Sequence, residues 1–177
     1  MFPIVVASDE KTVKQLAEIL SLFFTTSLVT EREIAVEKNC DILIINTNNI
    51  KNLKLDKGIL ILSDSCDTEL EECICPVIIA DGNRAFLHEK INSKTQYITC
   101  GMSAKDTISF SSIDIEEVSV SLMRELKKVN GETVEPFEIS VCSKSSISSY
   151  SPFCILSSIA LITVLGATIN GLKLRLK

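Results

Sequence analysis

Three short runs of aliphatic residues constrain the fold of this chain more than any other feature. Residues 41–46 (DILIIN), 58–63 (GILILS) and 76–80 (PVIIA) contain no alternating polar positions. A strand with one face in water alternates apolar and polar residues, so a continuous run indicates a strand that is buried on both faces. Such strands are typical of parallel sheets. The sequence therefore predicts an α/β domain built on a parallel sheet.

The segments around these runs alternate between strand and helix patterns. Val13, Leu16 and Leu20 recur at helical spacing after an apolar run at residues 3–7. The further expected elements are a strand at 27–30, helices at 31–38 and 83–91, and a strand at 96–99. This order predicts a three-layer, Rossmann-like α/β fold with a mostly parallel sheet of five or six strands and helices on both faces.

The pattern changes near residue 116. Val118, Val120 and Leu122 alternate with polar residues, and Asn130 and Gly131 form a strong hairpin-turn signal before an apolar stretch that ends at residue 141. We expect an antiparallel edge hairpin over 116–141 and a closing helix over 152–168. We treat residues 1–177 as a single domain, with an N-terminal βα half (1–75) and a second half (76–177).

The segment 152–169 has a second interpretation. It has 18 residues without a charge and is followed by Lys173, Arg175 and Lys177, which meets the minimum for a tail anchor in a membrane. Its serines and threonines, and its proline start, favour a buried helix instead. An odd number of cysteines (seven), several of them within apolar runs, indicates free thiols in a reducing compartment. We therefore expect a cytoplasmic protein, with membrane attachment as the alternative.

Charge and motif spacing argue against several functions. The net charge of -5 and the lack of a basic cluster predict no binding to nucleic acid. Cys66, Cys73, Cys75 and His88 do not have the usual spacing of a zinc site, so we predict no metal and no cofactor. Residues 1–70 loosely resemble a receiver domain, but Asn46 stands at the phosphoacceptor position and cannot form an acyl phosphate, so we predict no phosphorylation. A receiver-like or flavodoxin-like topology without phosphorylation is a further alternative.

A phosphate-binding loop is missing. Such a loop needs glycines between a strand and a helix, so that backbone amides can approach phosphates. Residues 7–12 (ASDEKT) contain none, and the first glycine of the chain is Gly58. Asp9 and Glu10 stand where phosphates would lie, as expected for a capped helix start.

The order of segments from Asp41 to Gly171 resembles the central, ATP-binding domain of the Mur ligases, which join amino acids to a peptidoglycan precursor. Residues 76–82 (PVIIADG) resemble the family's strand that ends in Asn-Ala-Asp-Asp, and residues 97–101 (YITCG) resemble its Ile-Thr-Tyr-Gly strand. The hairpin region ending at residue 137 and the helix at 150–166 also match the order of the family.

The functional prediction rests on the positions at which this sequence differs from the family pattern. Ile79 replaces the first Asn of that motif and Gly82 its last Asp, so only Asp81 is retained. Tyr150, Ser151 and Cys154 stand in place of the family's His-Asn-x-x-Asn residues. Because the phosphate loop is also missing, the resemblance implies a degenerate Mur-ligase-like pseudoenzyme without ligase activity.

We therefore predict no catalytic residues and a domain that binds an unknown protein or small molecule, with homo-oligomerisation possible. The alternative is a nucleotide- or small-molecule-binding module. In either case the binding residues are expected at the carboxyl ends of the parallel strands. This predicted rim consists of Ser8, Asp9, Asn46, Thr47, Ser63, Asp64 and Asp81.

Overall fold

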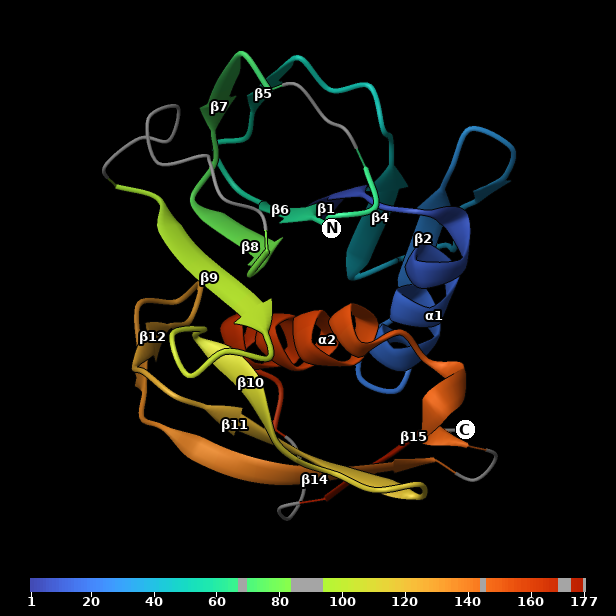
Figure 1. Cartoon of the computed structure of the whole chain (residues 1–177). Helices are drawn as coiled ribbons and strands as arrows, with labels where there is room; N and C mark the ends of the chain where they lie inside the picture. Colours follow the sequence, from blue (N-terminus) through green and yellow to red (C-terminus); the bar gives the residue numbers. More distant parts are fainter. Residues whose placement is uncertain (67–69, 84–93, 144–145, 169–172, 177) are drawn as a thin grey trace.

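The structure, a computed structural model, describes residues 1–66, 70–83, 94–143, 146–168 and 173–176. One eleven-stranded mixed sheet organises the molecule (Figure 1). Its order is β15-β14-β11-β10-β9-β8-β6-β1-β4-β2-β3. The strands are β1 (Phe2–Ala7), β2 (Thr26–Val29), β3 (Ile34–Ala35), β4 (Ile42–Asn46), β6 (Ile59–Leu62), β8 (Val77–Asp81), β9 (Gln96–Gly101), β10 (Ile108–Ile113), β11 (Glu117–Leu122), β14 (Phe137–Ser143) and β15 (Lys173–Leu176).

The three aliphatic runs form the parallel centre of this sheet, as predicted. β1 lies between β4 and β6, and β8 and β9 continue the parallel order. Val6 is opposite both Asn46 and Ile61, so the carboxyl ends of these strands lie at one edge of the sheet. The expected sheet of five or six strands was too small, because β3, β10 and β15 gave no clear signal and extend it to eleven.

The second half of the sheet is largely antiparallel. β11 pairs antiparallel with β10 and with β14, while β15 adds parallel to β14 and forms the edge. The predicted hairpin strands therefore pair, but they do not lie at the edge. Asn130 and Gly131 turn the chain between two short strands, β12 (Leu126–Lys127) and β13 (Thr133–Val134), and Gly131 has a φ of 91°.

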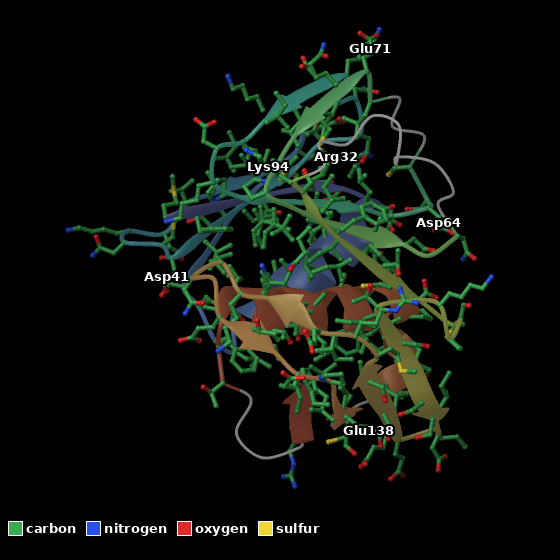
Figure 2. The ribbon with its side chains drawn as sticks, turned by 90° about the vertical axis from the view of Figure 1, so that its left-hand side faces the viewer. Arg32, Asp41, Asp64, Glu71, Lys94 and Glu138 are labelled. Atoms are coloured by element: carbon green, nitrogen blue, oxygen red, sulfur yellow. The ribbon has the colours of Figure 1, made fainter. Side chains whose placement is uncertain are left out.

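The two described α-helices, α1 (Glu10–Leu20) and α2 (Pro152–Leu165), share one face of the sheet. The sheet curves around α2, so that β8 and β9 lie on one side of the helix and β11 and β14 on the other (Figures 1 and 2). The opposite face of the parallel strands is covered by a small sheet of β5 (Asn52–Lys54) and β7 (Glu72–Ile74). We predicted helices on both faces; within the described residues both helices lie on one, and the expected helix at 83–91 lies outside those residues.

α2 explains the membrane-like segment of the sequence. Every residue from Phe153 to Val164 is buried, so the helix is apolar on all sides because protein surrounds it. Hydroxyls inside it donate to the preceding turn, as Ser158 does to the carbonyl of Cys154 at 2.7 Å. Gly166, in a left-handed conformation, ends the helix. Among the described residues, no helix combines the length and hydropathy that a membrane crossing requires.

The predicted helix at 31–38 was wrong. The hydroxyl of Thr30 accepts hydrogen bonds from the amides of Arg32 and Glu33, which fixes a turn. The chain then pairs as β3 with β2, placing Ile34 opposite Val29. Local hydrogen bonding to Thr30 and sheet pairing thus outweigh the helix propensity of this charged segment.

Candidate functional site

A row of buried polar side chains crosses the carboxyl ends of the parallel strands. Ser8, Ser63 and Asp81 follow or end the adjacent strands β1, β6 and β8. The alternating residues before them, such as Val6 and Ile79, belong to the core on the helix face, so these polar residues point to the same side. All three are buried, and Ser8 is fully inaccessible. The structure therefore brings together three of the predicted rim residues in one row.

The other rim residues lie beside this row or at its margins. Asn46 ends β4 on the helix face and is 9% exposed, and its Oδ1 is buried without a hydrogen-bond partner among the described residues. The amide of Thr47 continues the parallel ladder to the carbonyl of Val6. Asp64 is exposed, and Asp9 belongs to the start of α1. The rim is thus a buried row with exposed residues at its margins, and not one continuous pocket.

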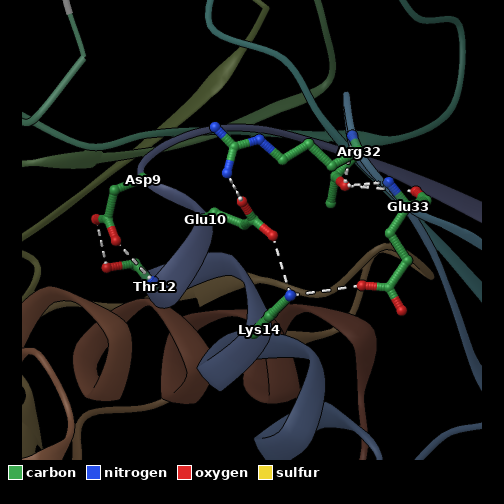
Figure 3. Close-up of polar contacts among 7 residues, drawn as sticks. Asp9, Glu10, Thr12, Lys14, Arg32 and Glu33 are labelled. Carbon is green, nitrogen blue, oxygen red and sulfur yellow. Dashed lines mark hydrogen bonds and ion pairs between the residues drawn. The ribbon is translucent and has the colours of Figure 1, made fainter.

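The amino-terminus of α1 is occupied by its own carboxylate. Asp9 is the N-cap: its carboxylate accepts hydrogen bonds from the amide of Thr12 at 2.9 Å and from the hydroxyl of Thr12 at 2.7 Å (Figure 3). Partial burial alone would raise the pKa of Asp9, but these hydrogen bonds outweigh it and lower the pKa. An anion attracted to the positive end of α1 would meet this negative charge first.

Two cations near this helix start, Lys14 and Arg32, are engaged in ion pairs. Lys14 contacts Glu10 at 2.9 Å and Glu33 at 3.4 Å, and Arg32 contacts Glu10 at 3.8 Å (Figure 3). The hydrogen bond and charge of Lys14 lower the pKa of Glu10, and Glu10 in turn raises the pKa of Lys14. These ion pairs offset the positive charge of Lys14 and Arg32 that a phosphate would need.

The start of α2 meets the start of α1. Ser151 is the N-cap of α2, and its Oγ lies 3.5 Å from Oγ1 of Thr12. Gln15 fixes this junction, because its side-chain amide donates to the carbonyl of Ser149 at 2.7 Å. Cys154 is fully buried, and burial raises its pKa to about 12, so it presents neither an accessible thiol nor a thiolate.

A cavity of about 540 Å³ opens between the ends of β8 and β9 and the first turn of α2. Its polar lining includes the carboxylates of Asp81 and Asp106, and its apolar lining comes from Met102, Phe153 and Leu156. This volume lies in the range of small-molecule sites. Of the predicted rim, only Asp81 lines the cavity.

Asp106 was missed by the sequence analysis. It lies in the turn before β10, is buried, and accepts a hydrogen bond from the amide of Ser103 at 2.9 Å. A side chain at Gly82 or Gly101 would collide with the Asp106 carboxylate. The glycine at position 82, which departs from the Mur ligase pattern, thus gives Asp106 its space. The signal in the sequence was a pair of glycines at the ends of two neighbouring strands: Gly82 follows β8, and Gly101 is the last residue of β9.

Electrostatics distinguish Asp81 from an ordinary surface carboxylate. Burial raises the pKa of Asp81, and the charges of Asp64 and Asp106 act in the same direction, although a hydrogen bond from the amide of Asn83 opposes them. Carboxylates close together in a partly apolar cavity favour a ligand that donates hydrogen bonds or carries positive charge. Within the described ranges, no group of three His, Cys, Asp or Glu residues is arranged to hold a metal ion, and His88 lies outside those ranges.

Removing the Asp9 cap should destabilise the protein. We expect Asp9→Ala to lower the free energy of unfolding by about 0.5–2 kcal/mol, because two donors of Thr12 lose their acceptor. Urea denaturation followed by circular dichroism measures this loss. Asp9→Asn retains an acceptor at the same position and serves as the control, so an equal loss in both variants would contradict the role given to the hydrogen bonds.

Ionisation of Asp81 should weaken the fold as pH rises. A carboxyl whose pKa is higher in the folded state binds its proton more tightly there than in the unfolded chain. Stability therefore begins to fall as the pH rises above about 3.8, the unperturbed pKa of an aspartate, and continues to fall until the pH has passed the raised pKa of the folded state. Asp81→Asn should remove this loss, giving a variant that exceeds the wild type near neutral pH and approaches it in acid. Thermal melts across the pH range test this, with the exposed Asp114→Asn as control; parallel curves for Asp81→Asn and wild type would contradict it.

The sequence matches no protein-family model and no curated protein. Similarity to solved structures is clear: the crystal structure of MurF ligase from Thermotoga maritima in complex with ADP matches with a TM-score of 0.55 at 10% sequence identity. The match covers 96% of this chain and 46% of that chain, so this protein spans less than half of the MurF ligase. At this identity the similarity concerns the fold alone. The chain has a Mur ligase-like, strand-rich α/β fold with a large mixed sheet.

Proposed function

We propose that this protein is a non-catalytic ligand-binding domain with a Mur ligase-like fold, and that its ligand occupies the cavity between Asp81, Asp106 and Phe153. The observation that carries the proposal is the placement of charge. The start of α1 is closed by the Asp9 carboxylate, while the cavity beside it combines two buried carboxylates with an apolar wall.

A nucleoside triphosphate does not suit the charge at the start of α1. A carboxylate about 4 Å from a phosphate charge is unfavourable by about 1 kcal/mol in water and by about 4 kcal/mol near a protein surface. Asp9 presents such a charge at the helix start, and Glu10 follows in the first turn. The MurF ligase structure contains ADP, but this chain lacks a glycine before residue 58 that would let backbone amides approach phosphates.

The cavity instead suits an amine with an apolar body. An ammonium group placed between Asp81 and Asp106 would relieve the repulsion between the carboxylates and lower the raised pKa of Asp81. Phe153 and Leu156, from the first turns of α2, would pack against the apolar part. Cys154 is the residue within α2 that stands in place of the family's motif. Its thiol is buried, so it presents no nucleophile to the cavity.

Benzylamine is a suitable probe, because it pairs one ring with one ammonium group. We expect saturable binding in an NMR titration, with amide shifts at Gly82, Gly101 and Ser103, and binding at least about tenfold weaker for benzyl alcohol. Asp106→Asn should weaken benzylamine and leave benzyl alcohol unchanged, whereas the exposed Asp114→Asn should change neither. Equal binding of the amine and the alcohol would contradict the assigned role of the carboxylates.

A scaffold role is the second candidate. The edge strand β3 exposes Ile34, at 76%, and is followed by Val36, at 64%. An unpaired strand edge with apolar side chains can pair with the same edge of a second copy. Light scattering of the wild type and of Ile34→Lys tests this, since a dimer that the variant dissociates would support the scaffold role and a wild-type monomer would exclude it.

A further inference from the structure

A second cavity, of about 640 Å³, lies at the opposite ends of the same parallel strands. Its lining includes Phe2 at the start of β1, Gly58 before β6, and Val77 at the start of β8. Lys94 precedes β9 and Asp64 follows β6, so these two labelled residues indicate the two opposite ends of the parallel strands in Figure 2. The cavity is therefore separated from the candidate site by the length of the strands.

The charge of this second cavity is the reverse of the first. Four lysines line it (Lys57, Lys94, Lys127 and Lys128), and among the described residues Asp56 is the one carboxylate of the lining. The whole chain has 18 basic and 23 acidic side chains, so such an excess of lysine at one cavity runs against the overall balance. Lys128 is partly neutralised by Glu132 at 2.8 Å. Lys57 and Lys127 together still exceed the single charge of Asp56, so the wall they form is positive.

An apolar floor accompanies the lysines. Phe2, Val77 and the partly exposed Val129 contribute aromatic and aliphatic surface to the cavity. The ammonium group of Lys57 lies 5.7 Å from the centre of the Phe2 ring, which holds a cation beside this surface. A ligand in the cavity would thus meet apolar surface and positive charge together.

The backbone that presents the lysines is held firmly. The side chain of Gln96 donates to the carbonyl of Lys127 at 2.9 Å and accepts from its amide at 2.7 Å. The amide of Val129 donates to the carbonyl of Val164 at the end of α2, also at 2.9 Å. Because these bonds fix the segment against β9 and α2, the backbone that carries Lys127 and Lys128 is preformed.

We propose that this cavity binds a small organic anion with a phosphate or other doubly charged head and an aromatic or aliphatic body. The lysines would hold the head, and Phe2 and Val77 the body. This inference is independent of the proposed function, because it concerns other residues, an opposite charge and the other end of the sheet.

Phenyl phosphate tests the proposal as a probe with one ring and one phosphate. We expect a saturable NMR titration with amide shifts at Gly58, Val77 and Lys128, and no shifts at Gly82 or Ser103. Inorganic phosphate and phenol should each bind at least about tenfold more weakly than the combined probe. Raising the salt concentration should weaken the binding, since exposed charges are screened.

Charge reversal at the cavity supplies the decisive comparison. Lys57→Glu combined with Lys127→Glu should weaken phenyl phosphate by at least about tenfold, and both side chains are exposed, so the fold should remain intact. The control is Lys38→Glu combined with Lys51→Glu, which makes the same charge change at exposed positions outside the lining. Equal binding to both double variants, the absence of saturation with wild type, or shifts centred on another surface would each overturn the proposal.

Discussion

Replacing Ile162 with alanine should lower the free energy of unfolding by about 2–5 kcal/mol, which is the typical result of removing a large side chain from a closed core. Ile162 lies in α2 and is 0% exposed, with protein on every side of the helix. The sheet that curves around α2 cannot collapse into the space without moving strands on both sides. Because domains of this kind are stable by only about 5–15 kcal/mol, the variant would lose a large share of its stability.

Chemical denaturation with urea measures this effect, and the chain provides a matched control. Ile115 is 81% exposed, in the turn between β10 and β11, so Ile115→Ala removes the same atoms from water instead of from the core. We expect a change within about 0.5 kcal/mol for that variant. Similar losses in the two variants would mean that α2 is not enclosed as the structure shows.

Replacing Gly101 with alanine should cost about 1–3 kcal/mol of stability, as expected for one extra methyl group in a filled space. The added carbon would collide with the carboxylate of Asp106, which is buried and held by the amide of Ser103. The backbone of Gly101 does not require glycine, because its φ is not positive. The cost should therefore come from Asp106 alone.

A double-mutant cycle isolates this contact. In an Asp106→Ala background the space is empty, and alanine at position 101, the last residue of β9, should cost little or even stabilise the fold, since alanine loses less backbone entropy than glycine on folding. The same alanine combined with the distant Asp114→Ala should retain its full cost. Additive losses for Gly101→Ala and Asp106→Ala would contradict the contact between them.

The sequence predicted the elements that depend on local pattern. Continuous aliphatic runs identified β4, β6 and β8, and the cap at Asp9 with helical spacing after it identified α1. The position of α2 against the sheet could not be read from its sequence, because an evenly apolar helix has no face that indicates a partner. β3 replaced a predicted helix, because the turn at Thr30 and pairing with β2 are decided by neighbours in space.

The candidate site was predicted only in part, for a related reason. Strand ends identified Ser8, Ser63 and Asp81, since parallel strands bring their carboxyl ends together. Asp106 comes from a turn between β9 and β10, and its role depends on the space left by two glycines. Only the three-dimensional packing shows that Gly82, read in the sequence as a lost acidic residue, lies against another carboxylate.

The central claim is that the Asp9 carboxylate occupies the start of α1, where a nucleotide's phosphates would have to bind. Titration of the wild-type protein with Mg·ATP, followed by the amide signals of Glu10, Lys11 and Thr12, tests it most directly. We expect no saturable shift of these three signals at millimolar nucleotide. Saturable shifts at these amides with a micromolar dissociation constant would contradict the account.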